Sequence, residues 1–414
     1  IVRQLPFELT DDQKAASKTL ADDLSRRVPM RRLLQGDVGS GKTVVAFATA
    51  AICLDSGGQV ALMAPTEILA RQHFRRAQEL FDGFGIEMEL LVGSLSSAAK
   101  SDAVAAIADG EVDLVVGTHA LFQDDVEFDA LGFVIVDEQH KFGVEQRDAL
   151  LAKGDDPHLL AMTATPIPRS LAHSVFGDLD LTLIREKPPG RKPIRTFLRD
   201  RNAARDVYAY VHDRVADSEE QAYLVYPMVE PSENAPNRRA AVPAAEKLAN
   251  GPFEGLRVAI LHGQMNDEAK NRTMSRFADG GVDVLCATTV VEVGMDVEQA
   301  TLMVIDGPEH FGLSQLHQLR GRVGRGHADS MCILLAGYGL TPDSRERLQS
   351  FAETNDGFLL AEKDLEIRGP GQFLGERQSG RAEFRFGDLL DDGDLLEKAR
   401  EDARRRVLGD AGSG

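Results

Sequence analysis

Short runs rich in Val, Ile and Leu recur along the chain, with longer segments of helical pattern between them. This alternation is typical of a parallel β-sheet whose strands are joined by crossover helices. In the first half, the runs predict strands at Leu33–Gln35, Val60–Ala64, Leu114–Gly117, Phe133–Asp137 and Leu159–Thr163. In the second half, they predict strands at Tyr223–Tyr226, Val258–His262, Val284–Thr288, Leu302–Asp306 and Cys332–Leu335.

A proline-rich segment interrupts this alternation once, near the middle of the chain. Lys187–Pro193 contains three prolines, which exclude a helix and predict a stiff linker. After about Gly339 the strand pattern stops and charged helical segments follow. We therefore expect an α/β protein with two doubly wound parallel-sheet domains, at 1–187 and 188–340, and a small helical and loop appendage at 341–414. Within the second domain, Val229–Pro243 is expected to be a surface excursion.

The ends and the hydrophobicity of the chain suggest a cytoplasmic fragment. A length of 414 residues exceeds what one ordinary core accommodates. No apolar run reaches the ~20 residues that span a bilayer, so no membrane contact is expected. The chain starts at Ile1 without a signal peptide or an initiator Met, which suggests a piece of a longer protein. Three widely spaced cysteines without a CxxC pair indicate buried thiols rather than zinc or disulfides.

The net charge of -19 argues at first sight against a nucleic-acid partner. Backbone amides, helix N-termini and a few cationic side chains can nevertheless bind phosphates locally. The chain has no Trp, and aromatic residues make up 6% of it, which disfavours a surface that stacks bases of single strands. Composition therefore leaves a duplex partner open.

The segment Gly36–Thr43 matches the phosphate-loop pattern G-x-x-x-x-G-K-[ST] in full. Lys42 would place a positive charge on the β- and γ-phosphates, and the Thr43 hydroxyl would bind Mg²⁺. An apolar strand precedes the loop and a helical run follows it, so an ATP site is favoured over an ordinary Gly-rich turn. The remaining residues expected to surround the phosphates are Gly36, Gly39, Ser40 and Gly41.

An acidic pair follows a second apolar strand. Asp137 and Glu138 come directly after Phe133–Val136, and strand ends of a parallel sheet are where ligands bind. Asp137 would hold Mg²⁺, and Glu138 would polarise the attacking water. Taken alone, Asp137 and Glu138 would be interpreted as solvated acids at an ordinary strand end. A phosphate loop in the same half of the chain favours a catalytic role for them.

Three arginines lie between glycines in the second half, at Arg320-Gly321-Arg322-Val323-Gly324-Arg325. A guanidinium stabilises the charge that spreads over a γ-phosphate during transfer. Because these arginines belong to the other domain, they would reach ATP only when the domains close. A basic surface loop is the alternative when the segment is taken alone.

In this order the motifs resemble superfamily-two helicases, which implies two RecA-like domains. Phe7 and Gln13 resemble the adenine-recognition element, and Asp137–His140 resembles the DExH box. The resemblance implies that Gln318, Arg322 and Arg325 approach the γ-phosphate, with Gly294 and Asp296 near the nucleotide and Asp296 at its ribose. The residues that it implies in DNA contact or coupling are Thr66, Thr118, His140, Thr163, Thr165 and Thr288.

Within the superfamily the chain looks like the RecG family of fork-remodelling helicases. Four segments are similar to segments shared by the RecG and Mfd families: Leu34–Gly39, Thr165–Arg169, Phe311–Gln318 and Asp364–Gly371. The shared C-terminal translocation motif implies movement on duplex DNA, with Arg368, Arg377 and Gln378 coupling domain motion to DNA. Gly177–Asp180, Pro188–Pro193 and Arg377–Gly380 look more like RecG than Mfd.

The resemblance implies an ATP- and Mg²⁺-dependent helicase that remodels branched DNA, such as stalled forks and Holliday junctions, in recombination and repair. It would work on the bacterial nucleoid, and replication or repair proteins are its expected but unidentified partners. The RecG family also carries an N-terminal wedge domain that this sequence lacks, so weak fork remodelling is expected. The alternatives are an Mfd-like transcription-repair motor, a nucleotide switch without hydrolysis, and a P-loop kinase.

Several other residues have a structural interpretation at this point. His317 is expected to be structural, and Phe311 and Phe358 are expected in the core, because duplex translocases contact the backbone rather than the bases.

Overall fold

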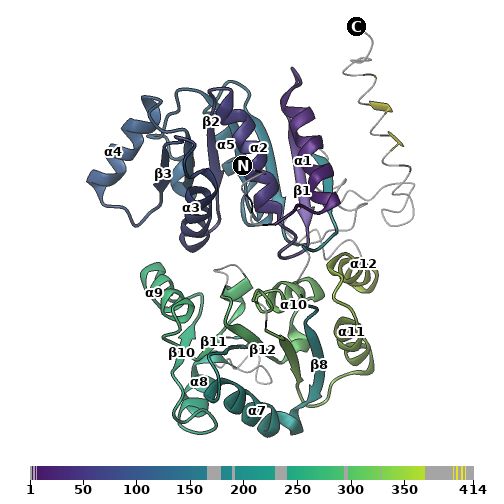
Figure 1. Ribbon diagram of the computed structural model, residues 1–414. Helices are drawn as coiled ribbons and strands as arrows, with labels where there is room; N and C mark the ends of the chain where they lie inside the picture. The colour runs from purple at the N-terminus through teal and green to yellow at the C-terminus, as the bar shows by residue number, and fades with distance from the viewer. Residues whose placement is uncertain are drawn as a thin grey trace.

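A computed structural model describes residues 2, 5, 7–165, 179–188, 192–228, 240–292, 297–326 and 328–368, with six positions between 395 and 406. Two parallel sheets form the centres of two lobes, which lie one above the other in Figure 1. The sheet of lobe 1 ends at Ile184 and the sheet of lobe 2 begins at Arg195. The predicted pair of doubly wound parallel-sheet domains is therefore confirmed.

Lobe 1 has a seven-stranded sheet in the order β3-β4-β2-β5-β6-β1-β7. Apolar side chains cover both of its faces and form two separate cores. Its strands are β1 (Arg31–Gly36), β2 (Gln59–Met63), β3 (Met88–Leu91), β4 (Leu114–Gly117), β5 (Leu131–Val136), β6 (His158–Thr163) and β7 (Asp180–Ile184). Its helices are α1 (Asp11–Leu24), α2 (Lys42–Asp55), α3 (Glu67–Phe81), α4 (Ser97–Ala108) and α5 (Val144–Leu151).

Lobe 2 has a six-stranded sheet in the order β10-β11-β9-β12-β13-β8, again with a core on each face. Its strands are β8 (Arg195–Asp200), β9 (Gln221–Val225), β10 (Val258–Leu261), β11 (Val284–Ala287), β12 (Ala300–Asp306) and β13 (Met331–Ala336). Its helices are α7 (Ala204–Ala216), α8 (Ala241–Ala249), α9 (Asp267–Ala278), α10 (Leu313–Arg320), α11 (Pro342–Glu353) and α12 (Gly357–Arg368).

Three strands were not predicted from the sequence, and all three lie at sheet edges. They are β3, β7 and β8, and most of their residues are only half-buried or exposed. An edge strand has one neighbour and a partly solvated face, so it does not need a continuous apolar run. The pattern of hydrophobic residues therefore identified the interior strands and missed most of the edges.

The two lobes contain the same local hydrogen-bonding and helix-capping arrangements. At the start of β2, Gln59 Nε2 donates to the carbonyls of Ile107 (3.0 Å) and Val112 (2.8 Å). At the start of β9, Gln221 Nε2 donates in the same way to the two carbonyls that flank the corresponding turn, those of Phe277 and Val282. Side chains of Ser96 and Asn266 cap the equivalent helices α4 and α9. The fold is thus one α/β unit used twice.

Two expectations about the second half need correction. The predicted excursion at Val229–Pro243 covers 229–239, which lie outside the described residues, but α8 already begins at Ala241. Pro243 fits there because the N–H groups of a first helical turn have no intrahelical partner to lose. The predicted appendage begins with α11 and α12, whose Leu348, Phe351 and Leu360 are buried in the core of lobe 2.

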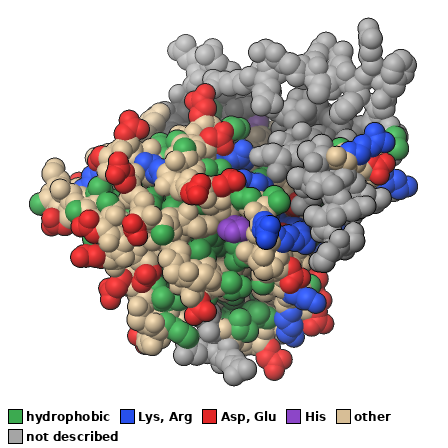
Figure 2. Space-filling view, turned by 90° about the horizontal axis from the view of Figure 1, so that it is seen from above, with side chains coloured by type: hydrophobic (Ala, Val, Ile, Leu, Met, Phe, Trp, Pro, Cys, Tyr) green, Lys and Arg blue, Asp and Glu red, His purple; other side chains and the backbone are tan. Residues whose placement is uncertain are grey.

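The acidic charge of the chain is dispersed on the face seen in Figure 2. Asp and Glu side chains are spread over the described surface there, with Lys and Arg side chains among them. Among the described residues, no helix combines the length and the hydrophobicity needed to cross a membrane.

Candidate functional site

The phosphate loop connects the end of β1 to the start of α2. Gly39 (φ 72°) and Gly41 (φ 85°) adopt the left-handed conformation, which favours glycine. A Cβ on Gly41 would also lie 2.2 Å from Gln13 Nε2, so a side chain at this position would displace the amide that donates to the Ser40 carbonyl. The loop therefore turns its backbone toward the N-terminus of α2, where the N–H groups of the first turn are available to an anion. Ser40 is buried within the loop, and Thr43 is the second residue of α2.

Lys42 is buried at the start of α2. Its Nζ donates to the carbonyl oxygens of Gly36 (2.7 Å) and Asp37 (3.0 Å). Burial lowers the pKa of Lys42, the charges of Glu138 and Asp137 act against this, and the Arg325 guanidinium adds to the lowering. The ammonium group thus lies within the electrostatic reach of both predicted catalytic acids and of one arginine from lobe 2.

The acidic pair follows β5. Glu138 has left-handed backbone angles (φ 49°, ψ 53°), which are strained for a residue with a side chain. The Ala164 N–H donates to Glu138 Oε2 at 3.3 Å, and this ties the acid to the segment after β6. Burial raises the pKa of Glu138, the charge of Asp137 raises it further, and Lys42 and Arg322 act in the opposite direction. A buried carboxyl with a raised pKa is a proton acceptor suited to activating water.

His73 is a site residue that the sequence did not reveal. It lies in the middle of α3, and its Nε2 is 2.7 Å from Asp137 Oδ2. Burial acts to raise the pKa of Asp137, but the hydrogen bond and charge of His73, together with Lys42, lower it overall. Since His73 and Asp137 are 64 positions apart, no local motif joins them.

Two further predicted residues meet across the lobes. Gln318 Nε2, from α10, donates to the Thr165 hydroxyl of lobe 1. The Thr165 N–H in turn donates to Thr163 Oγ1 at 3.1 Å, at the end of β6. A direct hydrogen bond therefore connects the segment after β6 with the helix that leads to the arginines.

The predicted arginines lie just after α10, whose end packs against the phosphate loop. Arg322 is buried, and its charge acts on Glu138; Arg325 acts on Lys42 and donates from Nε to the Gly321 carbonyl at 3.3 Å. At Gly321, an added Cβ would lie 2.8 Å from the Val38 side chain in the loop. The structure thus brings the second lobe into contact with the phosphate loop.

The adenine-recognition residues lie at different depths. Phe7 is 39% exposed, whereas Gln13 is buried. The Gln13 side chain accepts from Thr10 N (2.9 Å) and donates to the Ser40 carbonyl (2.8 Å). Gln13 therefore holds the phosphate loop against the start of α1, and a contact to a base is a second role that stays a prediction.

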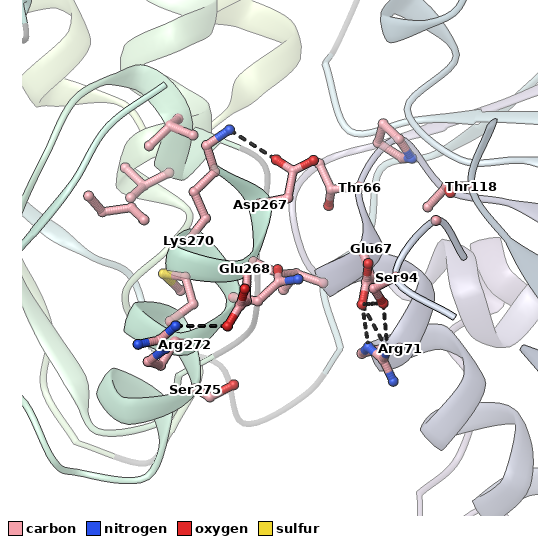
Figure 3. A pocket seen from close by; sticks show the side chains of 18 of the residues that line it. Thr66, Glu67, Arg71, Ser94, Thr118, Asp267, Glu268, Lys270, Arg272 and Ser275 are labelled. Atoms are coloured by element: carbon pink, nitrogen blue, oxygen red, sulfur yellow. Dashed lines mark hydrogen bonds and ion pairs between the residues drawn. The ribbon is translucent and has the colours of Figure 1, made fainter. Parts of the chain in front are cut away.

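Two of the residues of lobe 1 predicted for DNA contact or coupling, Thr66 and Thr118, line a cleft of about 830 Å³ between the lobes, whereas Thr163 and Thr165 do not. Thr66 caps α3 by accepting from Leu69 N (3.3 Å), and Thr118 is buried with no hydrogen-bond partner for its Oγ1 in the described part of the chain. Figure 3 shows both residues opposite α9, which carries Lys270 and Arg272. Thr288 is buried at the end of β11.

Other predicted residues lie wholly or partly outside the described residues. Gly294, Asp296, Arg377 and Gln378 are not described, nor are the side chains of His140 and Arg368. Phe311 is buried in the core of lobe 2, as predicted, whereas Phe358 is half-buried with Arg185 5.4 Å from its ring centre.

Family models match three consecutive parts of the chain. Residues 10–173 match the DEAD/DEAH box helicase family, and residues 212–327 match the helicase conserved C-terminal domain. Residues 354–413 match the C-terminal part of domain 3 of the ATP-dependent DNA helicase RecG. This last match disfavours the Mfd alternative.

Curated relatives point to the same family. The chain is 47% identical over 403 residues to the ATP-dependent DNA helicase RecG of Thermotoga maritima, covering 97% of this chain and 51% of the relative. It is 46% identical over 411 residues to RecG of Bacillus subtilis, covering 99% of this chain and 60% of that protein. The chain thus spans only about half to three-fifths of the length of these relatives.

A solved structure of RecG bound to a three-way DNA junction is similar along nearly the whole chain. The TM-score is 0.80 at 44% identity, covering 96% of this chain and 51% of the other. Yeast Dbp5 bound to RNA, at 17% identity and a TM-score of 0.58, shows a likeness of fold alone. The sequence identity, the family models and this structural match together show that the chain belongs to the RecG family of DNA helicases.

Proposed function

We propose that this chain is the ATP-driven motor of a RecG-type helicase, which moves on duplex DNA and remodels branched DNA. The observation that carries the proposal is the contact of the lobe 2 arginine segment with lobe 1: a Cβ on Gly321 would lie 2.8 Å from Val38 of the phosphate loop, and Gln318 donates to Thr165. Arg322 and Arg325 act electrostatically on Glu138 and Lys42, although they belong to a different sheet. An ATPase whose site is shared by two lobes couples hydrolysis to their relative motion.

The proposed chemistry assigns a role to each group. Lys42 binds the β- and γ-phosphates, Glu138 accepts the proton of the attacking water, and Arg322 and Arg325 stabilise charge on the transferred phosphoryl group. Gln318 holds the arginine segment to Thr165 and so to the segment after β6. These roles need no movement of lobe 1 itself, because the phosphate loop and the acidic pair belong to one sheet.

Mg²⁺ fits the residues at this site. The ion binds through one or two carboxylates together with substrate phosphates, and it neutralises phosphate charge. Asp137 and Thr43 would hold it, and His73 fixes the orientation of the Asp137 carboxylate through its 2.7 Å hydrogen bond. The lowered pKa of Asp137, which results from His73 and Lys42 acting against burial, keeps that ligand ionised.

The cleft between the lobes is the proposed DNA-contacting face. Thr66 and Thr118 approach it from lobe 1, and Lys270 and Arg272 approach it from lobe 2. The orphaned Thr118 hydroxyl is a donor of the kind that contacts phosphate oxygens. The related RecG bound to a three-way junction supports branched DNA as the substrate. The proposed place of action is a bacterial cytoplasm, on nucleoid DNA, because the RecG relatives of Thermotoga maritima and Bacillus subtilis are bacterial.

One assay tests this function directly. The ATPase rate of the chain is measured without DNA, with single strands, with duplex and with a three-way junction. Stimulation chiefly by duplex or junction DNA, lost in Lys42→Ala because ATP no longer binds, is expected. Equal, measurable rates in all four conditions would contradict a DNA motor, and ATP binding without hydrolysis in any of them would favour a nucleotide switch.

A further inference from the structure

Asp37 lies within the phosphate loop, and its carboxylate makes hydrogen bonds and an ion pair that have no role in the proposed ATP hydrolysis. Its carboxylate is buried and accepts from its neighbour's backbone, Val38 N, at 2.7 Å. The same oxygen, Oδ1, also accepts from His317 Nε2 of lobe 2, and Oδ2 lies 2.8 Å from Lys187 Nζ in the segment between the lobes. One loop carboxylate is therefore held from three directions, two of which lie outside lobe 1's sheet.

His317 transmits this contact along α10. Its Nδ1 accepts from Arg320 Nη2 at 3.0 Å, so its Nε2 carries the hydrogen that is donated to Asp37. Burial lowers the pKa of His317, which agrees with a neutral ring that donates at one nitrogen and accepts at the other. Arg320 is fully buried, and the His317 ring therefore links it by two hydrogen bonds to Asp37 of the phosphate loop.

Arg320 continues the chain of contacts to the start of the C-terminal region. Its Nη1 donates to the carbonyls of Phe351 (3.0 Å) and Thr354 (2.8 Å), and its guanidinium lies 4.2 Å from the Phe351 ring centre. These carbonyls belong to the end of α11 and the turn before α12. The path thus runs from the loop, through α10, to the segment that joins α11 and α12.

Lys187 supplies a second path between the same two places. Besides Asp37, its Nζ reaches the carbonyl of Asn355 at 3.0 Å. Asn355 directly follows Thr354, which Arg320 contacts, so both paths end at one turn. That turn lies at the start of residues 354–413, the part that matches the RecG-specific family model. Figure 1 shows α10 and α12 on the side of lobe 2 that faces lobe 1.

The packing at Gly321 explains why movement of the phosphate loop would be transmitted to α10 and to the contacts of His317 and Arg320. A Cβ there would lie 2.8 Å from Val38, the residue after Asp37. The end of α10 and the phosphate loop are therefore in close contact, and a packed contact of this kind transmits small displacements. A buried carboxylate that loses one of its hydrogen-bond donors is destabilised, so Asp37 and His317 are expected to move together.

We propose that Asp37, His317, Arg320 and Lys187 form a relay that sets the phosphate loop and the α11–α12 turn in position together. His317 is its central positioning residue, and it touches no substrate in the proposed reaction. The inference rests on the proposed ATPase function. It deepens that function by naming how nucleotide binding in lobe 1 reaches the C-terminal region.

The test compares two replacements at His317. His317→Gln offers an amide donor toward Asp37 and an acceptor toward Arg320, whereas His317→Leu keeps the volume without either group. Stimulation of the ATPase by junction DNA should fall about tenfold in His317→Leu, a typical allosteric coupling factor. It should stay within about threefold of the parent in His317→Gln, by the same scale. Nucleotide affinity should change little in both variants.

A second measurement needs neither DNA nor ATP. Small-angle scattering should show a larger radius of gyration for His317→Leu than for His317→Gln, because one of the direct links between the lobes, the hydrogen bond from His317 to Asp37, is lost. Lys187→Met should act like His317→Leu, and Lys192→Met is the matched control. Lys187 and Lys192 both line a small cavity of about 160 Å³, but Lys192 pairs with the exposed Asp329 instead of Asp37.

The outcomes separate this relay from the proposed function. If His317→Leu keeps the stimulation and the dimensions of the parent, the relay is wrong. If Gln and Leu are equally impaired, the hydrogen-bonding groups of His317 do not account for the loss and the relay is also wrong. If His317→Leu does not fold by circular dichroism, His317→Gln and Lys187→Met decide in the same way. If the parent itself ignores DNA, the proposed function fails and scattering alone decides the relay.

Discussion

Glu138 combines an unfavourable backbone with a chemically useful position. Its φ of 49° lies in the left-handed region, where a side chain costs roughly 1–2 kcal/mol. Lobe 2 forms the same turn after β12 with a glycine, Gly307 (φ 72°, ψ 48°). The two lobes therefore differ at this position in chemistry and not in geometry. Strain retained at a carboxylate next to Lys42 indicates selection for function over stability.

Glu138→Gly tests this interpretation. The free energy of unfolding should stay level or rise by up to about 1 kcal/mol, because glycine relieves the strain but is more flexible when unfolded. ATP turnover should fall by about 10²-fold or more, because the general base is removed. Thermal or denaturant unfolding and steady-state ATPase assays measure the two effects.

Asp156 provides the matched control for this substitution. Its φ is 56°, it lies on the surface, and it pairs with Arg31 at 3.0 Å. Asp156→Gly should therefore change stability by a similar small amount and leave turnover unaltered. A Glu138→Gly protein that was destabilised by several kcal/mol would show instead that the glutamate is needed for the fold.

At the scale of elements, the sequence predicted those features whose residues lie close together along the chain. The phosphate loop, the acidic pair and the interior strands each occupy a few consecutive residues, and the structure has the strands and the turns in place. His73 and His317 were missed or undervalued because their carboxylate partners lie 64 and 280 positions away. A histidine inside an amphipathic helix gives no local sign of such a partner. The edge strands were missed because they are not fully buried.

Helix α3 connects the cleft between the lobes to the acidic pair. It begins after Thr66 at the cleft, and two turns later His73 contacts Asp137. His73→Leu should raise the Mg²⁺ concentration needed for half-maximal nucleotide binding by about tenfold, the usual effect of losing a group that orients a metal ligand. His73→Gln, which retains a donor, should be less affected.

The readout for His73 is nucleotide binding rather than turnover. A fluorescent ADP analogue is titrated at several Mg²⁺ concentrations, and binding in EDTA serves as the internal control because the carboxylate then has no ion to hold. Equal Mg²⁺ dependence in the parent and in His73→Leu would remove His73 from the site.

At the scale of the whole molecule, one α/β unit occurs twice but only lobe 1 carries a phosphate loop. In lobe 2 the corresponding turn after β8 holds Arg201, whose Nη1 is 2.7 Å from the buried Asp306 at the end of β12. Asp306 occupies the position that Asp137 has in lobe 1. An ion pair thus occupies the second lobe's equivalent position, and Arg322 and Arg325 of that lobe are proposed to act at the site of the first.

Arg325→Ala measures how far catalysis depends on this asymmetry. Loss of a guanidinium that stabilises the transferred phosphoryl group should lower turnover by about 10³-fold. Affinity for ATP should change far less, because the loop and Lys42 remain intact in lobe 1. Arg325→Lys should recover only part of the rate, since an ammonium cannot make the paired hydrogen bonds of a guanidinium.

Arg345→Ala removes an exposed arginine of the same lobe, paired with Asp200, and should turn over like the parent. Single-turnover hydrolysis at saturating ATP separates chemistry from product release, and an unaltered single-turnover rate in Arg325→Ala would show that lobe 2 takes no part in the chemical step.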